Sequence, residues 1–348
     1  MKLASKTFKA AVLFKQKSKL KVIDIKLPSR LKKGQVLVKV ISASICGAQI
    51  GEIKGDKGAD KWLPHCMGHE GYGLVIAKNN SVKTLKKGNY VIMHWRKGSG
   101  LNAKPAVYKS KFGNINAGQI TTFQEYSVIS ENRLTKINKI DDKNHIIAPL
   151  LGCAIPTSWG ILNNEMHMNL KKSYLIFGAG GIGTTLALIG KIYKINNLLV
   201  VDKFNYKRIF LKKIGIDFIT VNDLRNKKLK FDNIIDTTGN TKIISMGYDF
   251  LAKDGRLILV GQPKKNDILR IKDPLRMFNQ PNDHVKISTS DGGLFEPKNQ
   301  MKRIYNLMIK NAQKFRKIIS YNINLTEINK AIEYVKKGKS IRVAINFK

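Results

Sequence analysis

The stretch Tyr174–Gly183, with the sequence YLIFGAGGIG, decides the fold of one part of this 348-residue chain. Four apolar residues typical of a buried strand run into a G-x-G-x-x-G turn, and helix-forming residues follow at once. The first glycine permits the tight turn, the second lets the backbone approach a pyrophosphate, and the third lets helix and strand pack. The helix N-terminus offers unpaired N–H groups to phosphates. We expect a dinucleotide to bind at Gly178, Gly180, Gly181, Ile182 and Gly183.

The acidic residue Asp202 indicates which dinucleotide this site prefers. It ends the next apolar stretch, Leu198–Asp202. Its carboxylate can accept hydrogen bonds from a ribose diol and repels a 2′-phosphate, so the sequence favours NAD over NADP. The neighbouring Lys203 partly neutralises that charge and softens the preference.

The rhythm of strands and helices predicts two domains. Around the glycine turn, strands alternate with helices such as Thr184–Tyr193, which predicts a doubly wound parallel Rossmann sheet and an α/β class. Up to about Lys139 the chain is instead β-rich, and it closes on a strand at Arg342–Phe347. We expect residues 154–288 to form the nucleotide-binding domain, and residues 1–153 and 289–348 to form the other domain. The expected strands of the β-rich part are Phe8–Phe14, Leu20–Ile25, Gln35–Ile41, Gly73–Ala77, Tyr90–Trp95 and Phe123–Val128.

The composition of the chain indicates where the protein is located and which kinds of partner it binds. There is no secretory signal and no apolar run of the roughly 20 residues that a membrane span needs, so we expect a cytoplasmic protein that does not bind membranes. The chain has 63 basic and 24 acidic residues, a formal net charge of +39. Because the lysines are spread along the whole chain, we interpret the charge as compositional bias and expect no specific nucleic acid. Attraction of an anionic substrate and weak, salt-sensitive nucleic-acid binding remain the alternatives.

Two of the three cysteines and a histidine are the candidate metal ligands. An odd number of cysteines without a secretory signal argues against a disulfide framework. Cys46, His69 and Cys153 offer two thiolates and an imidazole, a set that binds catalytic zinc with one position left open. The positions are far apart in the sequence, so each can equally be a buried core residue.

Five motifs in order give the chain its resemblance to the zinc-containing medium-chain dehydrogenase/reductase family, the alcohol dehydrogenases: Ile45–Gly47, Gly68–Gly71, Gly152–Thr157, Gly178–Gly183 and Gly338–Arg342. The resemblance implies a GroES-like catalytic domain beside the Rossmann domain, and a zinc-dependent, NAD-linked alcohol dehydrogenase. It implies zinc ligation by Cys46, His69 and Cys153, with Glu70 behind them or as an alternate ligand. It also implies that Thr157 and Ile182 lie against the nicotinamide and that Arg342 reaches the pyrophosphate.

Two departures from the family pattern matter. The stretch Lys97–Gly118, where many relatives carry four cysteines for a structural zinc, contains none, so we expect one catalytic zinc per chain and no structural zinc. Relatives usually carry Ser or Thr two residues after the first ligand, to relay the alcohol proton, whereas this chain has Ala48. The relay must then use another donor, water or nothing, and the candidate donors are Gln49, Glu52, His65 and His94.

The leading hypothesis is therefore an oxidoreductase that transfers a hydride between NAD(H) and an alcohol, aldehyde or ketone. The alternative is a catalytically impaired NAD-binding protein of the same fold, and the missing hydroxyl at position 48 is its best support. Arg96 and Lys97 allow an anionic substrate. We expect a homodimer or homotetramer.

Overall fold

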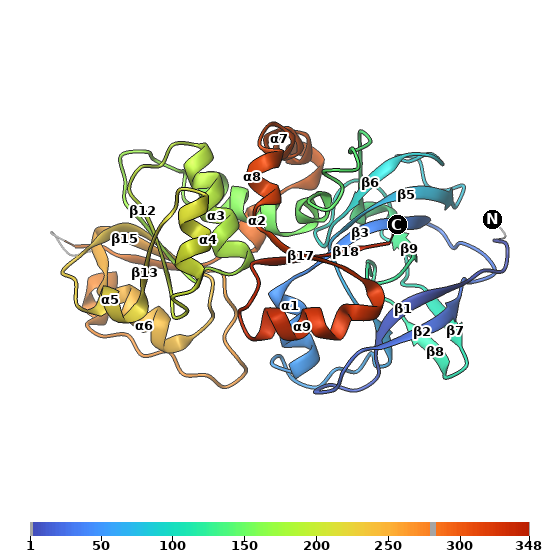
Figure 1. Ribbon diagram of the computed structural model, residues 1–348, viewed down its shortest axis with the longest axis horizontal. Coiled ribbons are helices and arrows are strands. Elements are labelled where there is room, and N and C mark those ends of the chain that lie inside the picture. The colour runs from blue at the N-terminus through green and yellow to red at the C-terminus, as the bar shows by residue number, and fades with distance from the viewer. Residues whose placement is uncertain (1–2, 279–282, 348) are drawn as a thin grey trace. The chain divides into compact units, whose positions relative to one another are not determined.

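The computed structural model describes residues 3–278 and 283–347, and the chain divides into two compact units (Figure 1). Unit 1 comprises Met1–Pro156 with Glu296–Lys348, and unit 2 comprises Thr157–Phe295. The domain boundaries predicted from the sequence, after residue 153 and before residue 289, lie a few residues from these limits. Each unit has its own apolar core, so each is described by itself.

Unit 2 is a parallel sheet with the strand order β13-β12-β11-β14-β15-β16. In chain order this is 3-2-1-4-5-6, the order of a dinucleotide-binding Rossmann sheet, so that part of the fold prediction is correct. The four residues of β11 are all buried because a parallel sheet is covered on both faces. The strands are β11 (Tyr174–Phe177), β12 (Leu198–Asp202), β13 (Asp217–Thr220), β14 (Phe231–Asp236), β15 (Leu251–Leu259) and β16 (Lys286–Thr289).

The helices of unit 2 follow its strands. Helix α3 starts at the residue after Gly180, directly behind β11, and two shorter helices begin at side-chain caps: Thr220 accepts from the Asp223 N–H, and Asn240 accepts from Lys242 and Ile243. The helices are α3 (Gly181–Ile192), α4 (Lys207–Lys213), α5 (Val221–Arg225) and α6 (Thr241–Asp249), while α2 (Ala154–Gly160) spans the junction of the units.

Unit 1 combines a closed barrel with a second, larger sheet. The barrel has the order β1-β2-β7-β8-β4, and the sheet has the order β10-β6-β5-β3-β18-β17, with β9 also paired to β3. The strands are β1 (Thr7–Leu13), β2 (Lys21–Lys26), β3 (Gln35–Ile45), β4 (His65–Cys66), β5 (Gly71–Lys78), β6 (Tyr90–Met93), β7 (Val107–Ser110), β8 (Gly113–Asn116), β9 (Tyr126–Ser130), β10 (Leu134–Ile137), β17 (Ile319–Asn324) and β18 (Arg342–Asn346).

The C-terminal strand β18 pairs with β3 and so completes the large sheet from the other end of the chain. The helices of this unit are α1 (Gly47–Lys54), α7 (Pro297–Lys310), α8 (Ala312–Arg316) and α9 (Ile328–Lys336). Helix α9 packs against α1, and Figure 1 shows these two segments side by side although they are distant in sequence. In the described part of the chain, no helix is long and apolar enough to cross a membrane.

Candidate metal and cofactor sites

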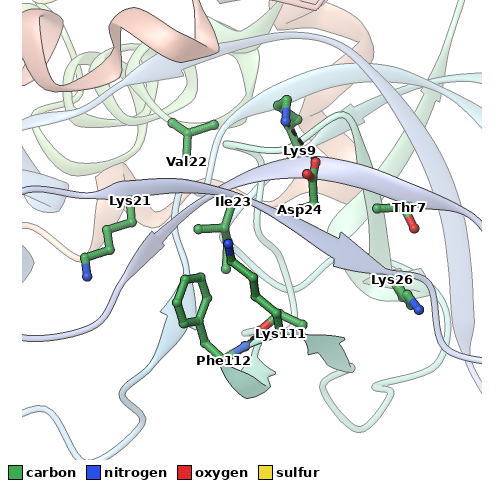
Figure 2. Close-up of a pocket in the computed structure, with 10 residues that line it drawn as sticks. Thr7, Lys9, Lys21, Val22, Ile23, Asp24, Lys26, Lys111 and Phe112 are labelled. Carbon is green, nitrogen blue, oxygen red and sulfur yellow. Dashed lines mark hydrogen bonds and ion pairs between the residues drawn. The ribbon is translucent and has the colours of Figure 1, made fainter.

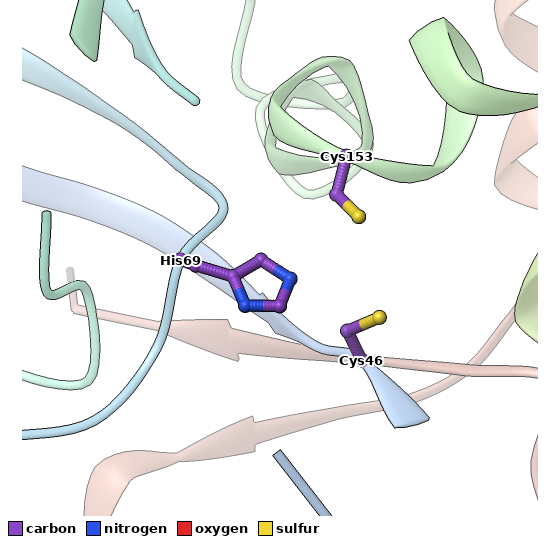
Figure 3. Close-up of side chains that lie close together, drawn as sticks. All are labelled: Cys46, His69 and Cys153. Atoms are coloured by element: carbon purple, nitrogen blue, oxygen red, sulfur yellow. The ribbon is translucent and has the colours of Figure 1, made fainter. Parts of the chain in front are cut away.

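The structure brings Cys46, His69 and Cys153 together in unit 1, with their ligand atoms all within 4.8 Å of one another (Figure 3). Cys46 follows the last residue of β3 and caps the N-terminus of α1. Cys153 follows the short 3₁₀ helix Ala148–Gly152. A Cβ atom at Gly152 would lie 2.4 Å from the Met93 carbonyl oxygen, so this backbone approaches the sheet closely only because position 152 is glycine.

The electrostatics of the cluster suit a cation. The pKa of the Cys46 thiol is lowered well below its ordinary value, first because Cys153 donates a hydrogen bond to its sulfur, and also because His69 and Arg342 lie near. The same bond and burial raise the pKa of Cys153. Among the described residues, the buried Nε2 of His69 has no hydrogen-bond partner. An unsatisfied ring nitrogen that faces two sulfurs is the donor set that zinc prefers, so these residues fit a zinc ion.

Glu70 and Arg342 form a buried ion pair in the same unit. The Arg342 Nη1 donates to Glu70 Oε1 at 2.8 Å and to the Ile45 carbonyl at 3.3 Å, and the two side chains are 1% and 0% exposed. Burial raises the pKa of Glu70 to about 7, against the opposing charge of Arg342. Glu70 is not part of the three-residue ligand group, and Arg342 is engaged with Glu70. Their suggested roles as alternate ligand and as pyrophosphate partner remain predictions.

The four candidate proton donors are all engaged with other groups. Gln49 contacts the Cys46 backbone and His69. The ring nitrogens of His94 contact the Arg96 carbonyl at 2.7 Å and the Thr135 hydroxyl at 2.9 Å, and burial lowers the pKa of His94 to about 4.

His65 lies in a cluster with two carboxylates. Its Nδ1 lies 2.9 Å from the Cys66 carbonyl, and its Nε2 lies 2.7 Å from Asp60 and 3.7 Å from Glu52. Since the carbonyl can only accept, Nδ1 donates to it, and Nε2 is left facing the two carboxylates.

Side chains of Ser130–Asn132 form hydrogen bonds with the stretch Lys97–Gly118. This stretch lacks the cysteines of a structural zinc lobe. Glu131, 1% exposed, accepts from the Leu101 N–H at 2.8 Å. The Ser130 hydroxyl accepts from the Ala103 N–H at 2.8 Å and donates to the Leu101 carbonyl. These hydrogen bonds therefore hold Leu101 and Ala103 of this segment against Ser130 and Glu131.

The glycine turn of unit 2 has the geometry that a dinucleotide needs. Gly178 has a φ of 98°, and Gly180 immediately precedes α3. A Cβ atom at Gly183 would lie 1.8 Å from the Gly178 carbonyl oxygen, so only glycine lets the helix pack this close to the strand. The buried Thr157 is followed by Ser158, whose hydroxyl donates to the Ile182 carbonyl at 3.4 Å. This contact places Ser158 beside the first turn of α3, and the role of Thr157 at the nicotinamide stays a prediction.

Asp202 ends β12 and is bound by its own chain. Its Oδ2 accepts from the Ala179 N–H at 2.8 Å and from Lys207 Nζ at 2.9 Å, while Oδ1 accepts from the Phe204 N–H. Lys207 is buried, and the sequence did not predict its role. The lysine that it did point to, Lys203, lies over the Phe204 ring. The partial neutralisation expected at Asp202 thus comes from Lys207.

A separate surface pocket of about 650 Å³ lies on the barrel of unit 1 and shares no residue with the metal cluster (Figure 2). Four lysines line it, and one of them, Lys9, pairs with Asp24 at 2.9 Å. Solvent-exposed lysines of this kind carry part of the chain's high charge without a buried polar group to define a ligand.

Comparisons with known proteins agree with this geometry. Residues 32–139 match the family described as the alcohol dehydrogenase GroES-like domain. An S-(hydroxymethyl)glutathione dehydrogenase from Escherichia coli is 24% identical over 375 residues, which cover 97% of this chain and 99% of the relative. These matches support the zinc-containing medium-chain dehydrogenase/reductase family as the one that this chain resembles. The resemblance predicted from five short motifs is therefore confirmed, and zinc and NAD are the cofactors expected for the family.

Solved structures of this family share the fold over the whole chain. An alcohol dehydrogenase zinc-binding domain protein from Burkholderia ambifaria has a TM-score of 0.87 at 19% identity, covering 99% of this chain and all of that chain. Benzyl alcohol dehydrogenase from Acinetobacter calcoaceticus has a TM-score of 0.84 at 21% identity, with the same coverage. At these identities the likeness establishes the fold, and the predicted GroES-like and Rossmann parts are both confirmed.

Proposed function

We propose that this chain is a zinc-dependent, NAD-linked alcohol dehydrogenase, which interconverts an alcohol with an aldehyde or ketone. The observation that carries the proposal is the buried group of Cys46, His69 and Cys153, with an unsatisfied imidazole nitrogen facing two sulfurs. When bound there, zinc polarises a carbonyl oxygen or lowers the pKa of an alcohol. The glycine turn of unit 2 would hold NAD, which would supply the hydride acceptor or donor.

The chain's own residues hold these groups and handle the proton. The Glu70–Arg342 pair supports the ligands from behind, and Asp202 with Lys207 shapes the ribose subsite after β12. Position 48 carries no hydroxyl, so the proton of the alcohol leaves through water. General acid–base help is typically worth about 10²- to 10⁴-fold, so its absence slows an enzyme without abolishing catalysis.

We further propose one zinc per chain. The support is the cysteine-free segment Lys97–Gly118, whose backbone is held by Ser130 and Glu131. An anionic substrate and a homodimeric or homotetrameric assembly also stay proposals. The Arg96 guanidinium lies over the Trp95 ring at 5.3 Å, on the segment that we expect to line the substrate pocket.

The test combines metal content with turnover. Elemental analysis of purified protein should give one zinc per chain, and a screen of alcohols and aldehydes, phosphorylated ones included, should yield a change in NADH absorbance. Cys46→Ser should lose both zinc and activity. Cys66→Ser is the matched control: burial raises the pKa of this thiol, it lies outside the ligand group, and its loss should leave both properties intact. Two zincs, or none after metal-replete purification, would contradict the proposal.

A further inference from the structure

The side chain of Gln49 contacts the His69 ring at Nδ1, the ring nitrogen other than the one that has no hydrogen-bond partner. It is 1% exposed, in the first turn of α1. Its amide oxygen accepts a hydrogen bond from the Cys46 backbone N–H at 2.9 Å, and its amide nitrogen contacts Nδ1 of His69. Because a backbone N–H can only donate, the amide oxygen belongs at Cys46, and the NH₂ group therefore faces His69.

This orientation of the amide decides which nitrogen of His69 carries the proton. An NH₂ group can only donate, so Nδ1 of the ring accepts. A neutral imidazole then carries its single hydrogen on Nε2. Nε2 is the atom that points toward Cys46 and Cys153 in Figure 3. A proton on Nε2 blocks the lone pair that a metal ion needs.

Metal ligation needs the opposite arrangement. A histidine that binds a metal through Nε2 donates its Nδ1–H to a carboxylate, a backbone carbonyl or water. For Gln49 to accept that hydrogen bond, its amide must rotate by half a turn. The NH₂ group would then face the Cys46 N–H, and a buried donor would lose its partner.

We propose that Gln49 sets the zinc affinity of this centre, by favouring the tautomer of His69 that cannot ligate metal. Zinc binding is then coupled to rotation of the Gln49 amide and to loss of the hydrogen bond from the Cys46 N–H. The inference rests on the proposed function, because it takes Cys46, His69 and Cys153 as the zinc ligands. Gln49 is a positioning residue, since it acts on the metal through His69.

A carboxylate at position 49 can accept hydrogen bonds from both the Cys46 N–H and the Nδ1–H of His69. Both of its oxygens accept, so one can take the Cys46 N–H and the other the Nδ1–H of zinc-ligating His69, without any rotation. Partners of this kind typically change metal affinity by about 10- to 100-fold. Gln49→Glu should therefore bind zinc at least about tenfold more tightly than the wild type.

The affinity is measured by competition for zinc with a chromophoric chelator, on the full chain without NAD. Gln119→Glu is the matched control, because it adds the same charge in the same unit, beside Arg133, and should leave the affinity unchanged. An equal or lower affinity for Gln49→Glu would overturn the inference. A wild type that binds no zinc at micromolar free metal would instead overturn the proposed function.

A spectroscopic measurement on the wild type keeps the inference testable even if the Gln49→Glu chain does not fold. Long-range ¹H–¹⁵N spectra identify which imidazole nitrogen carries hydrogen. His69 should be in the Nε2–H form in the metal-free protein and in the Nδ1–H form after zinc is added. A metal-free wild type in the Nδ1–H form would show that Gln49 does not impose the tautomer, and the inference would fall.

Discussion

The carboxylate of Glu131 should contribute strongly to the stability of unit 1, and Glu131→Gln measures by how much. One oxygen accepts from the Lys83 N–H at 2.9 Å, the Thr84 N–H at 2.9 Å and the Thr84 hydroxyl at 2.8 Å, while the other accepts from the Leu101 N–H at 2.8 Å. Glutamine keeps the shape of the side chain. However, its NH₂ group must face either the Leu101 N–H or the other three donors.

The expected loss follows from these four hydrogen bonds. A hydrogen bond to a charged acceptor contributes roughly 1.5–3 kcal/mol, against roughly 0.5–1.5 kcal/mol for a neutral one, and an unsatisfied buried donor costs roughly 1–3 kcal/mol. With one donor orphaned and three bonds weakened, Glu131→Gln should lower the free energy of unfolding by about 3 kcal/mol near neutral pH. Thermal unfolding followed by circular dichroism, with zinc present, measures the effect.

The pH dependence gives the prediction a second test. Hydrogen bonds from Leu101 and Thr84 outweigh burial and hold the pKa of Glu131 below its ordinary value. The stability that Glu131 contributes is therefore fully present above the unfolded-state pKa of about 4.3, and is lost as the pH falls through the lower folded-state pKa. The difference in the free energy of unfolding between wild type and variant should disappear in that pH range.

The matched control for this substitution is Glu333→Gln on α9, where the partly exposed Glu333 side chain pairs with Lys336. It should leave the unfolding midpoint unchanged. A Glu131→Gln protein within about 1 kcal/mol of the wild type at pH 7 would refute the reasoning, since even one orphaned buried donor costs about that much.

Three further outcomes test the site. Asp202→Ser should lower the ratio of kcat/KM for NAD to that for NADP by roughly tenfold, equivalent to about 1.4 kcal/mol, because it removes a charge that repels a 2′-phosphate and releases Lys207 to bind one; a wild type that prefers NADP would contradict this. Ala48→Ser should raise, or at least not lower, kcat for alcohol oxidation near neutral pH, because it supplies the missing relay hydroxyl. His65→Ala and His94→Ala should each retain substantial activity; a roughly thousandfold drop in either, with zinc and NAD still bound, would identify that histidine as the relay.

Much of unit 2 was predictable because its strands are buried on both faces. Such strands read as short apolar runs, and the expected bounds of Tyr174–Phe177 and Leu198–Asp202 match β11 and β12. The β-rich unit was harder to predict. The hairpin strands β7 and β8, with the sequences VYKS and GNIN, are short and mostly polar, and no alternation in the sequence marks them.

One strand was predicted at the wrong place. The expected strand Phe123–Val128 is displaced relative to β9, Tyr126–Ser130, because the chain changes partners along this stretch. The Phe123 carbonyl accepts from the Ala11 N–H of β1, whereas Tyr126 begins the pairing with β3. A local pattern of apolar residues does not show where one partner strand ends and another begins.

At the metal and cofactor sites, the ligand residues could be predicted from the sequence, but the residues that contact them could not. Thiolates and imidazoles bind zinc, which made Cys46, His69 and Cys153 the candidate ligands, and the order of the family motifs supported that choice. The contacts of Gln49 with His69 and of Lys207 with Asp202 depend on how a helix turns relative to a loop, and the sequence does not specify that turn. The sequence marks Gln49 only as a possible proton donor, and it gives no signal for Lys207.

The position of β18 in the large sheet fixes the order in which this protein is completed during synthesis. Arg342, whose ion pair with Glu70 spans 272 residues of sequence, leaves the ribosome after the whole of unit 2. While unit 2 is being made, the nascent chain therefore carries Cys46, His69 and Cys153 without the buried arginine and without the strand that lies between β3 and β17 in the large sheet. Unit 2, whose strands are consecutive, can fold first. Until β18 pairs with β3, the Glu70–Arg342 ion pair cannot form and the large sheet lacks this strand.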